Sequence, residues 1–176
     1  FVGGYHHAKK AGILHVADHH ISPGKKQWTW GSGEFGKAWD RQLTDEDGPY
    51  FELMTGMFTD NQPDFSWIMP NEERNFCQYF MPYKNIGYVK NATIDAAVNL
   101  EVSGQMVSIK VYVTAPQQAL QIRLYIKEEL VLNAIADLSP TKTYETELEL
   151  PTNFIETDLK LEVFNKEGQE LVSYIP

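Results

Sequence analysis

The second half of the chain is a succession of short segments with strand-like patterning, each followed by turn residues. Apolar and polar side chains alternate with a period of two at residues 109–113 and again at 159–163. Dipeptides such as Ser103-Gly104 and Ser139-Pro140 mark turns between the segments. We expect seven strands, at Thr93–Val102, Met106–Thr114, Leu120–Ile126, Leu130–Ala136, Thr143–Leu150, Leu159–Asn165 and Glu170–Tyr174. Such a series predicts an antiparallel β-sandwich of the immunoglobulin or fibronectin type.

The composition of the chain changes sharply near residue 90, which predicts two domains. All five histidines and all four tryptophans lie before that point. Residues 1–90 carry nine Lys or Arg and eleven Asp or Glu, a net charge of −2. Residues 91–176 carry six and thirteen, a net charge of −7, and the two halves add up to the −9 of the whole chain. We therefore predict one domain over residues 1–90 and the sandwich over residues 91–176, the latter with a structural or spacer role.

The charge and the apolar patterning exclude some classes of partner. A net charge of −9 argues against nucleic acid, because binding to phosphates needs clustered Lys and Arg. No apolar run approaches the roughly 20 residues that a membrane-spanning helix needs. The single cysteine, Cys77, excludes an internal disulfide and a cysteine-based zinc site, and its aromatic neighbours predict a small, buried side chain. No cofactor is expected, the oligomeric state is not indicated, and Phe1 is not a natural start, so we expect that a leader or an upstream domain has been removed.

Residues 48–83 are the part of the first domain on which its function is expected to depend. Pro49–Thr55 alternates, so Glu52 shares one strand face with Tyr50 and Met54. A carboxylate between an aromatic ring and a thioether is either a charge held in a ligand pocket or a structural acid with a partner. The polar and aromatic loop that follows supplies three candidate ligand-binding residues, Gln62, Asp64 and Trp67.

Two tryptophans share one face of another short strand in this half. Trp28 and Trp30 lie two residues apart in Gln27–Gly31, so both indoles point the same way. They form either a stacking platform for a pyranose ring or part of a core. Further along, Lys37–Leu43 is expected to form a helical turn that contains Asp40, a candidate second carboxylate.

Histidines gather near the start of the chain. Ala11–His20 alternates as a strand, which places His15 and His19 on one face. No His-Glu-x-x-His motif is present, so we predict no metal site and expect these histidines to be hydrogen-bonded, near a ligand site or on the surface. His19 and His20 are candidates for a proton donor in such a site.

Several motifs of the first half resemble those of known families. The chain is similar to an uncharacterised bacterial family, whose members often carry tetratricopeptide repeats, at His15-Val16-Ala17-Asp18-His19-His20, Trp28-Thr29-Trp30-Gly31 and Asp47-Gly48-Pro49-Tyr50-Phe51-Glu52-Leu53. It also resembles the C-terminal part of galactose-mutarotase-like proteins at Glu52-Leu53-Met54 and at Phe65-Ser66-Trp67-Ile68-Met69-Pro70-Asn71-Glu72, which precedes an aromatic strand. The resemblance covers about residues 1–90.

This resemblance implies an all-β protein. It would consist of the C-terminal portion of a galactose-mutarotase-like antiparallel supersandwich, followed by the seven-stranded immunoglobulin- or fibronectin-like sandwich. The implied ligand is a carbohydrate on a concave face, where Glu52 takes the position of the catalytic base of the epimerases. Since residues 1–90 are too few for a whole supersandwich, we expect the chain to be the C-terminal portion of a longer protein. A periplasmic or extracellular location in a bacterium is implied by the resemblance alone.

Three functions remain open from the sequence. The first is an enzyme acting on carbohydrate, a glycoside hydrolase or an aldose-1-epimerase-like protein, with Glu52 as general base or acid. Its second carboxylate and its proton donor would come from Asp40, Asp64, His19 and His20. Its sugar-stacking residues would be Trp28, Trp30 and Trp67. The second function is a carbohydrate-binding module without catalysis, and the third is a structural or interaction unit.

Overall fold

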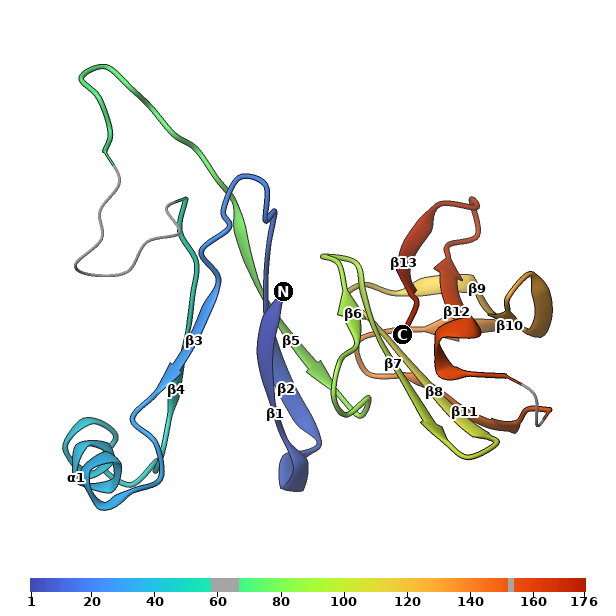
Figure 1. The fold of residues 1–176 in the computed structure, drawn as a ribbon, viewed down its shortest axis with the longest axis horizontal. Helices are drawn as coiled ribbons and strands as arrows, with labels where there is room; N and C mark the ends of the chain where they lie inside the picture. Colours follow the sequence, from blue (N-terminus) through green and yellow to red (C-terminus); the bar gives the residue numbers. More distant parts are fainter. Residues whose placement is uncertain (58–66, 152–153) are drawn as a thin grey trace. The chain divides into compact units, whose positions relative to one another are not determined.

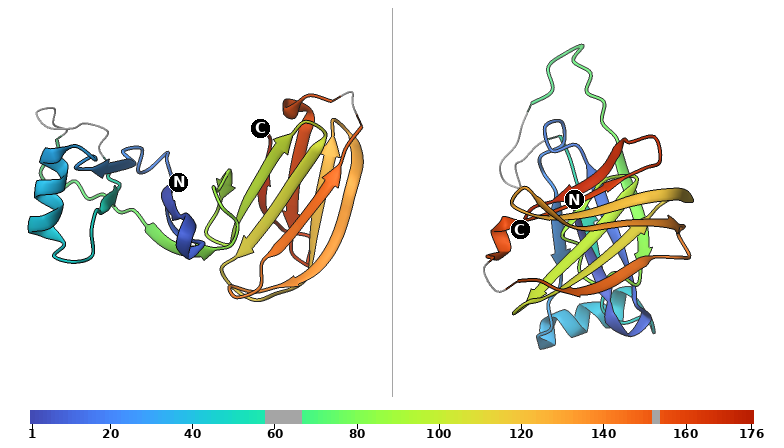
Figure 2. Two further views of the ribbon diagram at one scale, coloured as in Figure 1. Left: turned by 90° about the horizontal axis from the view of Figure 1, so that it is seen from below. Right: turned by 90° about the vertical axis from the view of Figure 1, so that its right-hand side faces the viewer.

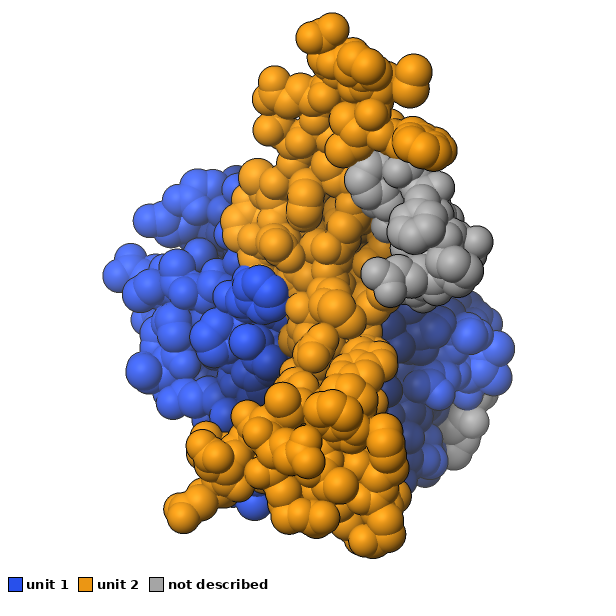
Figure 3. Space-filling model, turned by 90° about the vertical axis from the view of Figure 1, so that its left-hand side faces the viewer, with its two compact units in different colours: residues 1, 3–14, 80–176 blue, residues 2, 15–79 orange. Residues whose placement is uncertain are grey.

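The computed structural model describes residues 1–57, 67–151 and 154–176, and these belong to two compact units. Unit 1 contains Phe1, Gly3–Leu14 and Phe80–Pro176, whereas unit 2 contains Val2 and His15–Tyr79 (Figure 3). Unit 1 thus includes most of residues 1–14 as well as the region that was predicted to form a sandwich. Strands make up most of unit 1 and far outnumber helical residues in the described part of the chain, which confirms the prediction of a mainly β protein.

Unit 1 is built on two four-stranded antiparallel sheets (Figures 1 and 2). The first sheet has the order β11-β8-β7-β6 and the second has the order β10-β9-β12-β13. The strands are β6 (Asn91–Ala92), β7 (Ala96–Ser103), β8 (Met106–Val113), β9 (Gln117–Ile126), β10 (Glu129–Leu138), β11 (Tyr144–Glu149), β12 (Leu159–Phe164) and β13 (Glu170–Tyr174), with the 3-10 helix η2 (Glu156–Asp158) before β12. The seven predicted strands are confirmed, and β6 is an additional short one.

The core of the sandwich is formed by the inner faces of the two sheets. On the first sheet, β8 is completely buried at every second position, at Val107, Ile109 and Val111, and β7 contributes Val98. The second sheet contributes Leu120, Ile122, Leu124, Leu159, Leu161 and Val163. The period-two pattern of the sequence therefore reflects burial of one face of each strand.

The outer face of the first sheet carries polar side chains in a regular arrangement. Asn99 of β7 pairs with Lys110 of β8, and Lys110 pairs with Glu145 of β11. An amide, an ammonium and a carboxylate thus lie side by side across three strands. Glu147 occupies the same face of β11, two residues further along.

A further three-stranded sheet has the order β1-β2-β5. Its strands are β1 (Val2–His6), β2 (Ala11–Ala17) and β5 (Gln78–Lys84), and the 3-10 helix η1 (His7–Lys9) joins the first two. Within unit 1, Tyr5 stacks on Tyr83 with ring centroids 5.7 Å apart, and Tyr83 meets the ring of Tyr112 on β8 at 6.4 Å. The Tyr112 hydroxyl donates a hydrogen bond to the carbonyl oxygen of Pro82 at 2.9 Å. These contacts attach the hairpin of unit 1 to the outer face of the first sheet.

Unit 2 contains a two-stranded antiparallel ribbon and a helix. Strand β3 (Lys26–Thr29) pairs with β4 (Phe51–Met54), and α1 (Glu34–Leu43) extends the predicted helical turn at its start. Gly36 of α1 lies against the turn before the helix, since a Cβ there would be only 2.3 Å from the carbonyl oxygen of Gly31. α1, with 10 residues, is the longest helix in the described part of the chain, where no helix could span a membrane.

The prediction of a strand over Ala11–His20 is wrong at its C-terminal end, because β2 ends at Ala17. Asp18 ends the strand through local hydrogen bonds. Its Oδ1 accepts one from the backbone N–H of His20 at 2.9 Å, and its carbonyl oxygen accepts one from the N–H of Ser22 at 2.7 Å. His19 therefore lies in a turn and does not share a strand face with His15.

The prediction that Cys77 is buried is also wrong, since its side chain is exposed. Strand β5 begins only at Gln78, so the alternation inferred for Cys77 does not apply to it. Cys77 instead lines an open hollow of about 490 Å³ in unit 2, together with Asp18 and Tyr79.

Candidate functional site

Five aromatic side chains of unit 2 gather around β3 and α1, and we call them the aromatic cluster: Trp28, Trp30, Phe35, Trp39 and Tyr50. Trp30 stacks on Trp39 with ring centroids 4.8 Å apart and planes 9° apart. Trp28 meets Trp30 edge to face at 4.4 Å. The indole N–H of Trp30 donates to the Tyr50 hydroxyl oxygen at 2.9 Å. Stacking and the hydrogen bond together hold Trp30 in one orientation.

The members of the aromatic cluster differ in their exposure. Trp30 and Trp39 are half-buried against each other, whereas Trp28 keeps 38% of its surface exposed. Phe35 is more exposed still and contacts both Trp30 and Trp39 at its edge. The cluster therefore combines a packed centre with an accessible indole.

Glu52 lies directly opposite Trp28 in the β3–β4 ribbon. Directly opposed residues of an antiparallel pair project from the same face, with Cβ atoms about 4.5–5.5 Å apart. Glu52 is half-buried and, among the described residues, makes no ion pair. A carboxylate thus stands beside an accessible indole on one face of the ribbon.

Asp40, the predicted second carboxylate, is a buried residue of α1. It lines a small hollow of about 230 Å³ with Lys37, Arg41 and Thr44. The Thr44 hydroxyl donates to the backbone carbonyl of Asp40 at 2.8 Å. In the described part of the chain, no hydrogen bond or ion pair joins Asp40 to Glu52.

His19 and His20 lie with Asp18 in the exposed turn after β2. Their rings are 3.8 Å apart between centroids, and the ligating atoms of the three residues lie within 4.8 Å of one another. Two imidazoles and a carboxylate are donors that suit zinc and similar divalent ions. Neither histidine forms a hydrogen bond with Glu52 among the described residues.

The remaining predicted site residues follow β4 in the sequence. Trp67 is 82% exposed and is followed by exposed Ile68 and Met69. Gln62 and Asp64 lie outside the described residues.

His15 is buried, and it forms a hydrogen bond with Gln78, which is not part of the aromatic cluster. Its Nε2 lies 2.9 Å from the side-chain oxygen of Gln78, at the start of β5. Burial lowers the pKa of His15, although the hydrogen bond to Gln78 acts in the opposite direction. The neutral imidazole can donate to Gln78, so the contact has a structural role.

The sequence did not predict Phe35, Trp39 and Tyr50 as members of the aromatic cluster. A signal for two of them exists, since Phe35 and Trp39 are four residues apart and therefore share one face of α1. Tyr50 precedes Glu52 by two residues and so shares its side of the ribbon. Neither signal identifies Trp30 as the partner, because that contact is tertiary.

Comparison with known proteins finds two family models that match. Residues 1–108 match a family described as a domain of unknown function, DUF5107. Residues 91–174 match the second domain of YphG-like proteins. No solved structure matches the chain.

Proposed function

We propose a function for this chain, which belongs to the DUF5107 family over residues 1–108: it binds carbohydrate at the aromatic cluster beside Glu52. The observation that carries the proposal is the pairing of Trp28, which is exposed, with Glu52, which lies directly opposite on the same face. An indole presents an apolar, electron-rich face, and a carboxylate accepts hydrogen bonds from hydroxyl groups. A pyranose ring has both an apolar C–H face and a rim of hydroxyls, so it matches this pair.

The packing behind Trp28 also supports binding. Trp28 rests on Trp30, which is held by its stack on Trp39 and by the hydrogen bond to Tyr50. A side chain that is already ordered loses little conformational entropy when a ligand binds. The aromatic cluster is therefore preorganised for stacking, which favours affinity.

Binding without catalysis is favoured over turnover by the surroundings of Glu52. Glycoside hydrolysis needs two carboxyl groups, roughly 5–5.5 Å apart for retention and 6.5–9.5 Å for inversion. Anomer interconversion needs one base and one acid. Asp40 is buried in its own hollow, His19 and His20 lie in a turn, and among the described residues no hydrogen bond or ion pair joins any of the three to Glu52. The alternative is a glycoside hydrolase- or epimerase-like activity, which the Glu52→Gln variant distinguishes from binding alone.

We also infer a more specific fold for each part of the chain from its resemblance to galactose-mutarotase-like proteins. Residues 1–90 would be the C-terminal portion of a galactose-mutarotase-like supersandwich, and residues 91–176 an immunoglobulin-like sandwich. The antiparallel sheets of both units and the two facing four-stranded sheets of unit 1 are compatible with this assignment.

A matched pair of variants tests the proposed function. A glycan array identifies a ligand, and titration calorimetry then compares Trp28→Ala with Phe51→Ala. Phe51 is 42% exposed and lies on the opposite face of the ribbon, so it controls for loss of a similarly exposed aromatic ring. We expect Trp28→Ala to weaken binding about tenfold or more, the effect of losing roughly 1.4 kcal/mol, and Phe51→Ala to have little effect.

Glu52→Gln distinguishes the binding module from the enzyme. If Glu52 only accepts a hydrogen bond, the variant weakens binding and no turnover of the ligand is seen with the unmodified chain. Loss of turnover with binding kept within a few-fold would instead identify an enzyme. Absence of binding to any glycan, or equal effects of Trp28→Ala and Phe51→Ala, would remove the proposal.

A further inference from the structure

Unit 1 contains an open cleft of its own, separate from the aromatic cluster. The cleft has a volume of about 470 Å³, within the range of about 300–1,000 Å³ that is usual for small-molecule sites. Its floor is the outer polar row of the first sheet, formed by Asn99, Lys110 and Glu145. Every residue that lines the cleft belongs to unit 1.

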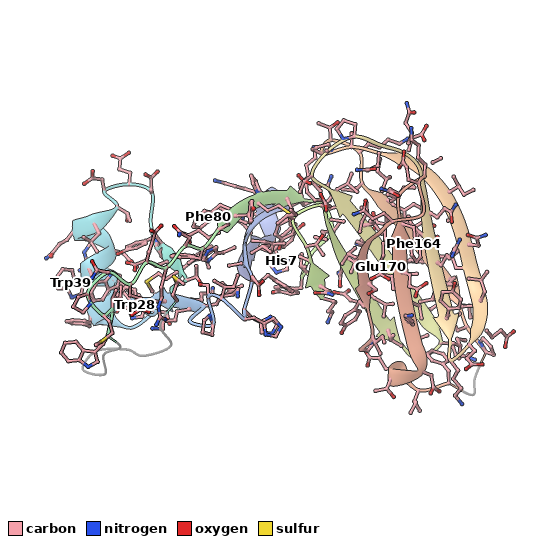
Figure 4. The ribbon with its side chains drawn as sticks, turned by 90° about the horizontal axis from the view of Figure 1, so that it is seen from above. His7, Trp28, Trp39, Phe80, Phe164 and Glu170 are labelled. Atoms are coloured by element: carbon pink, nitrogen blue, oxygen red, sulfur yellow. The ribbon has the colours of Figure 1, made fainter. Side chains whose placement is uncertain are left out.

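The opposite wall of the cleft is aromatic. Tyr5, His7 and Tyr88 contact one another, with ring centroids 5.2 Å apart for Tyr5 and His7 and 5.0 Å for His7 and Tyr88. Nε2 of His7 lies 2.7 Å from the hydroxyl oxygen of Tyr88 (His7 is labelled in Figure 4). Tyr5 is fixed from behind by its stack on Tyr83. Ring faces and edges therefore border the cleft in fixed positions.

Asn99, in the floor of the cleft, has a side-chain oxygen that receives no hydrogen bond from the described residues. The residue is only 3% exposed. Its amide N–H groups donate to the carbonyl oxygen of Ile86 at 2.9 Å and to a carboxylate oxygen of Glu101 at 3.1 Å. Its Oδ1 is buried and accepts no hydrogen bond from any described residue. Buried acceptors nearly always have a partner, so this oxygen remains available to a donor from outside the described residues.

The charges of the cleft indicate what kind of ligand it takes. Lys10 and Lys110 are balanced by Glu101 and Glu145, so the lining has no net charge. Lys110 lies 2.6 Å from Glu145, and this hydrogen bond raises the pKa of Lys110 and keeps it protonated. An anionic ligand would meet two carboxylates, and a cationic one would meet two ammonium groups. A neutral ligand with several hydroxyls satisfies both kinds of group.

We propose that this cleft is a second ligand site, which binds one neutral hexose unit between the Tyr5–Tyr88 wall and the Asn99–Lys110–Glu145 floor. The hydroxyls donate to Asn99 and Glu145 and accept from Lys110, while the apolar face of the ring lies against the aromatic wall. The site does not depend on the aromatic cluster of unit 2 and goes beyond the function proposed for it.

Amide chemical shifts test this site with three neutral probes: methyl α-D-glucoside, methyl β-D-galactoside and methyl α-D-mannoside. The whole chain, labelled with nitrogen-15, is titrated with each probe up to about 20 mM, which detects dissociation constants in the millimolar range. We expect at least one probe to shift the amides of Gly87 and Asn99 saturably. The four tryptophans all belong to unit 2, so tryptophan emission reports binding there and not in the cleft.

Glu145→Gln and Glu147→Gln form the matched pair for the cleft. Both residues are exposed glutamates on the same face of β11, but only Glu145 lines the cleft. We expect Glu145→Gln to weaken binding about tenfold and Glu147→Gln to leave it unchanged. Tyr88→Ala should weaken binding as well, with folding checked by circular dichroism.

The outcomes separate this site from the one proposed in unit 2. A Trp28→Ala chain should keep the shifts of Gly87 and Asn99, whatever happens to its tryptophan-detected binding. No saturable shift with any of the three probes would overturn the proposal, as would equal effects of Glu145→Gln and Glu147→Gln. Tighter binding of glucose 6-phosphate than of the methyl hexosides would overturn the assignment to neutral ligands.

Discussion

Replacing Gly36 by alanine tests whether α1 is held in place by direct backbone contact with the turn before it. A Cβ at this position would lie 2.3 Å from the carbonyl oxygen of Gly31 and 2.6 Å from that of Trp30. Both neighbours are backbone atoms, so they cannot rotate away, and the helix must move. Alanine gains about 1 kcal/mol over glycine in helix propensity, whereas overpacking costs about 1–3 kcal/mol. Because the overlap involves two backbone atoms, we expect a net destabilisation of about 1–2 kcal/mol.

The assay is urea denaturation followed by tryptophan fluorescence, since all four tryptophans lie in unit 2. Near-ultraviolet circular dichroism of the native protein should also change, because movement of α1 separates the stacked rings of Trp30 and Trp39. Gly33→Ser is the control: nothing lies within 4 Å of a Cβ there, and serine is a favoured N-cap residue. If Gly36→Ala is as stable as the unmodified protein and keeps its near-ultraviolet spectrum, the close packing of α1 is refuted.

Three further predictions concern stability. Ile109 is fully buried, so Ile109→Ala should destabilise the sandwich by about 2–5 kcal/mol in urea denaturation followed by far-ultraviolet circular dichroism. Ile135 is exposed, so Ile135→Ala should change the free energy of unfolding by less than about 0.5 kcal/mol. Tyr112→Phe should cost about 1 kcal/mol in the same assay, because the carbonyl of Pro82 loses its hydrogen bond. Burial lowers the pKa of His15, so the unfolded chain takes up the proton first as the pH falls below about 6.5. Unit 2 should therefore lose stability as the pH falls below that value. Tryptophan-detected denaturation at several pH values should show a smaller loss in His15→Gln than in the unmodified chain. An equal dependence of the unfolding free energy on pH in both proteins would contradict a contribution from His15.

The strands of the sandwich could be predicted from the sequence because each buries one face in a shared core. In β8, residues 107–113 alternate between fully buried and partly exposed positions over most of their length, so the pattern and the burial have the same period. The ends were less accurate, since β9 begins at Gln117 rather than at Leu120. Alternation reports burial, and the exposed residues at the start of a strand carry little of that signal.

Unit 2 was predicted less well because local and tertiary contacts override its patterning. The alternation of Ala11–His20 continues past Ala17, but the hydrogen bonds of Asp18 end the strand there. The pairing of Trp28 with Glu52 agrees with the predicted faces, since each was inferred from a period of two. The stack of Trp30 on Trp39 could not be predicted, because it depends on how α1 folds back over Gly31.

The row of Asn99, Lys110 and Glu145 illustrates how a ligand site can follow from the packing of a core. A slip of one residue between two strands turns every side chain to the other face of the sheet. Burial of Val98 and Val111, which pair across β7 and β8, therefore fixes the register, and the same register aligns the polar row on the outer face. The three polar residues lie in three separate segments, and each by itself resembles an ordinary solvated position. The cleft is thus visible only once the strands are paired, and a core substitution that shifted this pairing would remove its floor.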